Sequence, residues 1–228
     1  MNRILPVIAI VLALVAAGAW WLTQGGQTPE PQQTSVSATS GAGVDAAQDD
    51  AAQGDVIEMV LGDADAPVTL IEYASFTCPH CATFHEQVFR SLKADYIDTG
   101  KVKMVFRDVY FDRVGLWASM VARCGGAERF WGMTDLMMKT QSDWARSGDP
   151  VAITAELKKI GRLAGLDDTQ LQACMQDEDK AKSLVAWSEK NMGTHDVKGT
   201  PTLIINGTKH PNMSYSDLKP ILDAQIGG

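Results

Sequence analysis

The stretch "FTCPHC" at residues 76–81 places two cysteines at the point where one sequence pattern replaces another, and the fold prediction starts from it. The run that precedes it, "VTLIEYAS", is mostly apolar and is typical of a strand buried on both faces. After it, Phe84, Val88 and Leu92 recur every four residues, which predicts a helix over about 79–96. The two cysteines therefore stand where a strand turns into a helix.

This position gives the first cysteine an unusual chemistry. Pro79 suits a first helical turn, so Cys78 is predicted to lie at or near the N-cap, facing unpaired N–H groups and the positive end of the helix dipole. His80, when protonated, adds a positive charge. Such surroundings lower a cysteine pKa from ~8.5 to roughly 3.5–7.5. Because the disulfide gains nothing from them, a Cys78–Cys81 disulfide is expected to be easily reduced and to oxidise other proteins.

The rest of the sequence predicts an α/β fold with a helical insertion. Residues 102–109 alternate as a strand does, and everything from about 113 to 193 looks helical. A further strand at 202–207 closes on an Asn-Gly turn signal. Four smaller features complete the pattern: a possible edge strand at 56–61, helix caps at Asp149, Asp167 and Asp177, a helix stop at Gly165, and a last helix from Ser214 or Ser216 that Pro220 interrupts.

The N-terminal part departs from this pattern. Residues 4–22 carry no charge and as a helix would span roughly 28 Å, close to the bilayer core. Because Arg3 precedes the run, the remainder is expected outside the cytoplasm. We expect an uncleaved anchor over 1–23, with a signal peptide cleaved near Ala19 as the alternative. Residues 24–55 have the composition of a disordered linker, and the folded domain is expected over 56–228.

The net charge argues against two classes of polyanionic partner. The formal net charge is −8 and no block of basic residues occurs, which argues against binding to nucleic acid or to an anionic lipid surface.

The segments "IEYASFTCPHC" and "VKGTPTLIING" resemble the bacterial periplasmic disulfide oxidases of the DsbA type. The resemblance covers about residue 56 to the C-terminus and implies a thioredoxin fold interrupted by a helical domain. It implies that Cys78 is the nucleophile and Cys81 its buried resolving partner. It also implies that Thr200-Pro201 forms a cis-proline loop beside them, whose Thr200 backbone pairs with an extended substrate peptide.

Glu72 stands where this family carries a buried acid, which would pass a proton to or from Cys81. The alternative is an exposed strand glutamate without a role. Two positions depart from the family pattern. At position 200 the best-known oxidases have Val, whereas this chain has Thr, the residue that disulfide isomerases often carry there. Phe106 stands where some members have a lysine near the buried acid. The proton route and the redox potential are therefore expected to differ.

Cys124 and Cys174 remain once the motif takes Cys78 and Cys81. An exported chain lives in oxidising surroundings, so a structural disulfide between them is expected. Two free buried thiols, or a regulatory redox pair, are the alternatives.

The sequence thus predicts a thiol:disulfide oxidoreductase that oxidises newly exported proteins in the periplasm, with no cofactor, as a monomer. The resemblance implies a DsbB-like, quinone-linked membrane partner that reoxidises it. An isomerase or reductase of the same fold is the alternative, followed by a peptide-holding module. Metal binding through Cys78, Cys81 and His85, with His80 adjacent, is weaker still, because no second cysteine pair has ligand spacing.

Overall fold

The computed structural model describes residues 56–227 of the chain. The predicted anchor at 1–23 and linker at 24–55 lie outside the described residues. Within the described part, no helix combines the length and the apolar character needed to cross a bilayer.

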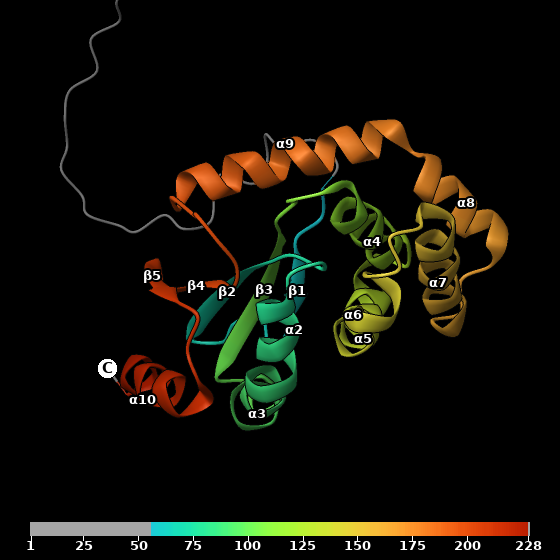
Figure 1. Cartoon of the computed structure of the whole chain (residues 1–228). Coiled ribbons are helices and arrows are strands. Elements are labelled where there is room, and N and C mark those ends of the chain that lie inside the picture. The colour runs from blue at the N-terminus through green and yellow to red at the C-terminus, as the bar shows by residue number, and fades with distance from the viewer. Residues whose placement is uncertain (1–55, 228) are drawn as a thin grey trace, which may run out of the picture. The chain divides into compact units, whose positions relative to one another are not determined.

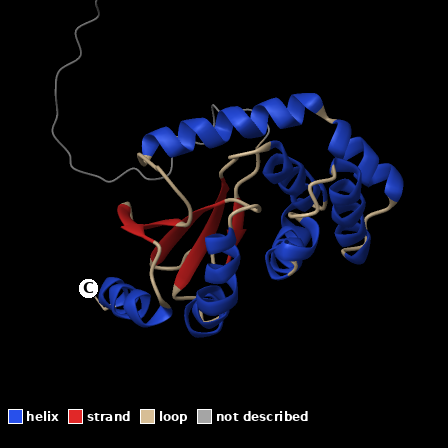
Figure 2. Cartoon of the chain, viewed as in Figure 1, coloured by secondary structure: helices blue, strands red, loops and turns tan. Residues whose placement is uncertain are grey.

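The core is a mixed five-stranded sheet (Figure 2). Its strands are β1 (Met59–Leu61), β2 (Val68–Ala74), β3 (Val102–Asp108), β4 (Thr202–Ile205) and β5 (Thr208–Pro211). They lie in the order β1-β3-β2-β4-β5, with β2 and β3 parallel and the other pairs antiparallel. The central β2 is covered on both faces, as its apolar run predicted. The first strand is shorter than the predicted 56–61, because only its last three residues pair with β3.

The helical segment after β2 supplies the crossover that a parallel pair requires. It runs through α2 (Pro79–Phe84), η2 (His85–Phe89), α3 (Arg90–Leu92) and η3 (Lys93–Ile97), where η marks π-helical turns. The predicted helix over 79–96 is confirmed. The two π-helical turns have no counterpart in the sequence prediction.

Helices cover both faces of the sheet (Figure 1). The segment from α2 to η3 and the C-terminal α10 (Tyr215–Ile226) pack on one face, and α9 (Glu178–Thr194) lies on the other. Ser214 caps α10 as predicted, but the predicted interruption at Pro220 is wrong, since the helix continues through it. Leu218 and Leu222 are both fully buried, and this packing offsets the hydrogen bond that Pro220 cannot donate.

The helical insertion consists of α4 (Arg113–Cys124), α5 (Gly126–Lys139), α6 (Gln141–Trp144), α7 (Pro150–Leu163) and α8 (Asp168–Gln176), and then α9. The three predicted aspartate caps are confirmed: each accepts a hydrogen bond from a backbone N–H in the first turn of its helix. Gly165 follows the end of α7 with a φ of +83°, a conformation that favours glycine. A disulfide joins Cys124 of α4 to Cys174 of α8.

Polar contacts tie the insertion to the end of β3. The guanidinium of Arg123 in α4 donates to the carboxylate of Asp108 at 2.9 Å, and both side chains are buried. From α9, Ser188 Oγ donates to the backbone oxygen of Asp108 at 2.7 Å. The long α9 therefore belongs to both parts, since it leaves the insertion and packs against the sheet.

Candidate active site

Cys78 lies at the N-cap of α2, as predicted, and Pro79 follows in the first turn. The backbone of Cys78 is extended (φ −80°, ψ 118°), and its carbonyl accepts the first helical hydrogen bonds, from Cys81 N at 3.1 Å and Ala82 N at 3.2 Å. Its sulfur lies partly exposed, 3.5 Å from the carbonyl oxygen of Thr200. Cys81 is fully buried, and both residues are thiols.

The surroundings lower the pKa of Cys78 to about 5. The largest cause is the thiol of Cys81, which donates to the Cys78 sulfur. Burial opposes it, and the Thr200 side chain and the backbone amides of Cys81 and His80 add to the lowering. The pKa of Cys78 is therefore lowered, as expected, but the main cause is the neighbouring Cys81 thiol rather than the helix terminus. His80 acts here through its backbone amide, and its side chain is exposed.

The pKa of Cys81 is shifted in the opposite direction. Its pKa is raised well above the ordinary range, first because it donates to Cys78, then because it is buried, and then because of the charge of Glu72. The pair therefore contains one sulfur that ionises easily and one that keeps its proton.

Glu72 is a buried carboxyl at the centre of the sheet, not an exposed strand residue. Its side chain is 1% exposed, and Oε2 has no hydrogen-bond partner. Burial raises its pKa to about 8, and the charge of Cys78 adds to the rise. Its neighbour in β3 is Phe106, so the position that could have supplied a compensating cation carries an aromatic ring instead.

The loop before β4 brings Thr200 and Pro201 to the cysteines, and the peptide bond between them is cis. Pro201 is buried. Thr200 Oγ1 is buried without a hydrogen bond of standard geometry, so it lowers the pKa of both sulfurs as a nearby dipole rather than as an aligned donor.

Sequence reasoning missed the residues that hold the strand-to-helix turn. Gln141 of α6 donates from Nε2 to Phe76 O at 2.8 Å and to Cys78 O at 2.9 Å. On the other side of the turn, Thr77 Oγ1 donates to Asp112 Oδ2 at 2.8 Å. A lone glutamine in a helical block has no motif around it, so the sequence offered no signal for this contact.

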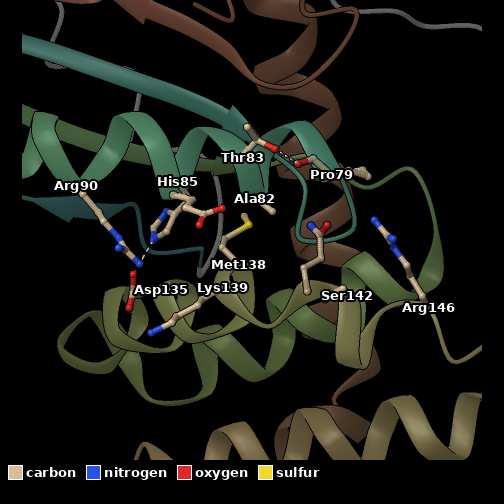
Figure 3. A pocket seen from close by; sticks show the side chains of 12 residues that line it. Pro79, Ala82, Thr83, His85, Arg90, Asp135, Met138, Lys139, Ser142 and Arg146 are labelled. Atoms are coloured by element: carbon tan, nitrogen blue, oxygen red, sulfur yellow. Dashed lines mark hydrogen bonds and ion pairs between the residues drawn. The ribbon is translucent and has the colours of Figure 1, made fainter. Parts of the chain in front are cut away.

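A pocket of about 280 Å³ opens beside Pro79, between the active-site helix and the insertion (Figure 3). Pro79, Thr83 and His85 face it from one side, and Asp135 of α5 from the other. His85 Nε2 contacts Asp135 Oδ1 at 3.1 Å, so this histidine is engaged across the boundary and not with the cysteines. Among residues 56–227, no group of three His, Cys, Asp or Glu side chains is arranged to hold a metal ion.

Comparison with known proteins places this site in a family. The thioredoxin family model matches residues 55–224 of the chain. The chain belongs to the thioredoxin family. This thioredoxin-family chain is 33% identical over 170 residues to a Rickettsia bellii protein named as a candidate protein-disulfide oxidoreductase. The match covers 74% of this chain and 64% of that protein, so the chain spans less than two thirds of that relative's length. It is also 26% identical over 174 residues to disulfide bond formation protein D of Bacillus subtilis, covering 74% and 77% of the two chains.

Solved structures confirm the thioredoxin fold with its helical insertion. The chain superposes on Wolbachia pipientis alpha-DsbA1 with a TM-score of 0.68 and 27% identity, covering 75% of this chain and 91% of that one. Oxidised BdbD from Bacillus subtilis gives a TM-score of 0.66 at 22% identity, and this likeness concerns the fold alone.

Proposed function

We propose that the protein is a thiol:disulfide oxidoreductase that donates the Cys78–Cys81 disulfide to protein substrates. The observation that carries the proposal is the asymmetry of the pair: Cys78 is partly exposed with a pKa of about 5, while Cys81 is buried with a raised pKa. An accessible low-pKa sulfur paired with a buried one is the arrangement that a reactive disulfide needs.

The reaction balances as two thiol exchanges. A substrate thiolate attacks Cys78 Sγ of the disulfide, which forms a substrate–Cys78 disulfide and releases Cys81 as a thiolate. Cys81 then takes up a proton, because burial raises its pKa, and Glu72, whose pKa is raised first by burial, would supply it. A second substrate thiolate attacks the substrate sulfur, so the substrate leaves as a disulfide and Cys78 leaves as a thiolate.

The lowered pKa of Cys78 favours oxidation of the substrate. At pH 7 a thiol with a pKa of about 5 gains at most about 2.7 kcal/mol on ionising. Because Cys78 is partly exposed, solvent screening reduces this to roughly 1–2 kcal/mol, or about 20–40 mV in a two-electron couple. The gain applies to the dithiol and not to the disulfide, so it favours oxidation of the substrate.

The remaining site residues support this chemistry. The Thr200 carbonyl lies 3.5 Å from Cys78 Sγ, and the cis Thr200-Pro201 loop would position an extended substrate peptide against the Thr200 backbone. The Cys124–Cys174 disulfide lies in the insertion and would serve as a structural bridge rather than as a redox pair.

The substrates and partners follow from the proposed reaction. The substrates would be cysteine-containing proteins newly exported to the periplasm, and a DsbB-like quinone-linked membrane protein would reoxidise the pair. The apolar run at 4–22 supports export, with residues 1–23 as anchor or signal, 24–55 as linker and 56–228 as the catalytic domain.

Alkylation of the reduced protein with iodoacetamide between pH 3.5 and 9 tests the proposal, with Cys78 followed by peptide mass spectrometry. We expect a midpoint near 5. A midpoint near that of an ordinary thiol would contradict an oxidase role.

One observation favours a second candidate, a disulfide isomerase or reductase of the same fold. Thr200 precedes the cis Pro201, at the position where disulfide isomerases of this fold often carry threonine. Equilibration with glutathione separates the two activities, because an isomerase or reductase would have a lower reduction potential than an oxidase.

A further inference from the structure

The strand-to-helix turn that presents Cys78 is held from the helical insertion by one buried amide. Gln141, the first residue of α6, is 4% exposed and donates from Nε2 to Phe76 O at 2.8 Å and to Cys78 O at 2.9 Å. An amide nitrogen carries two N–H groups, and here each serves one carbonyl. The donor and its acceptors are more than sixty positions apart in the sequence, so the contact exists only because the insertion folds back onto the turn.

The turn has no substitute for this contact. Among the hydrogen bonds of residues 56–227, the one that reaches Phe76 O comes from Gln141. Phe76 is buried, and a buried carbonyl without a partner is disfavoured. Loss of the Gln141 amide therefore leaves the turn either unsatisfied or rearranged, with Cys78 two residues away.

The second bond acts on Cys78 directly. Its carbonyl oxygen carries a partial negative charge close to its own sulfur, which opposes ionisation of that sulfur. Three donors offset this charge: Cys81 N, Ala82 N and Gln141 Nε2. The first two belong to any helix N-terminus, whereas the third comes from the insertion.

The short helix α6, which begins with Gln141, is held in place by buried contacts with the end of α5. Trp144, at the other end of α6, is 1% exposed and donates from Nε1 to Met137 O at 2.8 Å. Thr140, just before α6, donates from Oγ1 to Leu136 O at 2.8 Å. Both bonds anchor α6 to the end of α5, so the position of the Gln141 amide is set by the packing of the insertion.

We propose that Gln141 is a positioning residue through which the helical insertion sets the reactivity of Cys78. The inference rests on the proposed function, in which Cys78 is the attacked sulfur. It gives the insertion a part in the exchange reaction itself, because the insertion then helps to set the ionisation of Cys78.

The experiment compares Gln141→Met, Gln141→Glu and Gln141→Asn in the full chain. Met keeps the length but has no donor, Glu keeps the shape but in its protonated form offers one O–H for two carbonyl oxygens, and Asn keeps the amide but shortens its reach. Two controls match them. Gln172→Met makes the same change at an exposed glutamine that accepts from Lys158, and Asp135→Asn weakens another contact across the same boundary.

The readouts are the alkylation profile of Cys78 and the equilibrium with glutathione. At pH 4, below the Cys78 midpoint, we expect Gln141→Met to react about tenfold more slowly than the native protein, because the thiolate fraction falls tenfold for each pH unit of midpoint. Gln141→Glu, which is protonated at this pH and keeps one donor, should lie between them. At pH 7 the glutathione equilibrium should shift by the same factor toward the disulfide, about 30 mV. Both controls should keep the native profile, and Gln141→Asn should lie between native and Met.

The outcomes separate this inference from the proposed function. If the native protein itself shows an ordinary thiol midpoint, the proposed function fails. If the native midpoint is low and the Gln141 variants unfold cooperatively with an unchanged midpoint, the positioning role is refuted. Loss of cooperative unfolding in all three variants, with Gln172→Met intact, would also refute it, since Gln141 would then be a residue of the fold and not of the site.

Discussion

Replacement of Glu72 by Gln should stabilise the reduced protein relative to the native one by an amount that increases as the pH rises. Glu72 is 1% exposed and its pKa is raised from 4.5 to about 8, first by burial and then by the charge of Cys78. An acid with a raised pKa in the folded state contributes its full stability below pH 4.5 and loses it as the pH rises toward 8, because the unfolded chain can ionise the group and the folded chain resists this. Gln has no proton to lose, so the variant escapes this penalty.

The magnitude follows from the two pKa values. A difference of about 3.5 between 4.5 and 8 corresponds to about 5 kcal/mol of lost stability across that range, taken as an upper bound. The Gln amide adds a buried donor that needs a partner, which costs about 1–3 kcal/mol. That cost does not change with pH. The quantity to compare is therefore the pH dependence of the difference between the two proteins, not the difference at one pH.

Urea titrations of the dithiol form of both proteins at pH 4.0, 5.5, 7.0 and 8.5 measure this pH dependence. The free energy of unfolding of Glu72→Gln, minus that of the native protein, should rise by several kcal/mol from the lowest pH to the highest. Glu156→Gln, at an exposed residue paired with Lys159, is the matched control and should show a nearly constant difference. A Glu72→Gln difference that stays within 1 kcal/mol across the series would mean that the pKa of Glu72 is not raised in the folded protein. In the disulfide form Cys78 carries no charge, so the rise should still begin near pH 4.5 but should level off at a lower pH and be smaller.

Three further predictions concern the disulfide, the buried ion pair and the cis-proline loop. Replacing Cys124 and Cys174 by Ala opens a loop of 50 residues and should lower the free energy of unfolding by about 4 kcal/mol in urea titrations; a loss below 1 kcal/mol would show that the bridge constrains the unfolded chain little. Arg123→Met leaves Asp108 buried without its cation and should cost about 3–5 kcal/mol by the same assay, and a neutral result would mean that the site admits water. Thr200→Val removes a dipole that lowers the pKa of Cys78, so the alkylation midpoint should rise; an unchanged midpoint would show that the hydroxyl has no influence.

Much of the fold could be predicted because local signals and burial agree. The apolar run of β2, the aspartate caps and the glycine after α7 each state a local preference that the tertiary structure keeps. The failures occur where tertiary packing overrides the local signal. Pro220 breaks the pattern of a helix in sequence, yet the buried Leu218 and Leu222 hold α10 together across it.

The site shows the same division. The position of Cys78 at a helix N-cap follows from a strand, a proline and a periodic run, and all three are local. The ranking of the causes that lower its pKa does not follow, because it depends on how close the thiol of Cys81 lies. The role of Gln141 could not be predicted from the sequence, because its two acceptors come close to it only when the whole insertion folds.

The protonation states of Cys78, Cys81 and Glu72 depend on one another. In the dithiol near neutral pH, Cys78 is ionised, while Cys81 and Glu72 both hold protons. The charge of Cys78 raises the pKa of Glu72, and the charge of Glu72 raises the pKa of Cys81, so a second negative charge inside the site is disfavoured. When a substrate attacks the disulfide, Cys78 becomes part of the mixed disulfide and carries no charge, and Cys81 leaves as a thiolate in the buried interior. A proton on Glu72 can then move to Cys81, and the charge passes to a carboxylate whose pKa of about 8 lies far closer to neutrality than that of the thiol. The burial that makes Glu72 costly to the fold is thus what keeps it protonated at neutral pH, as the proposed exchange requires.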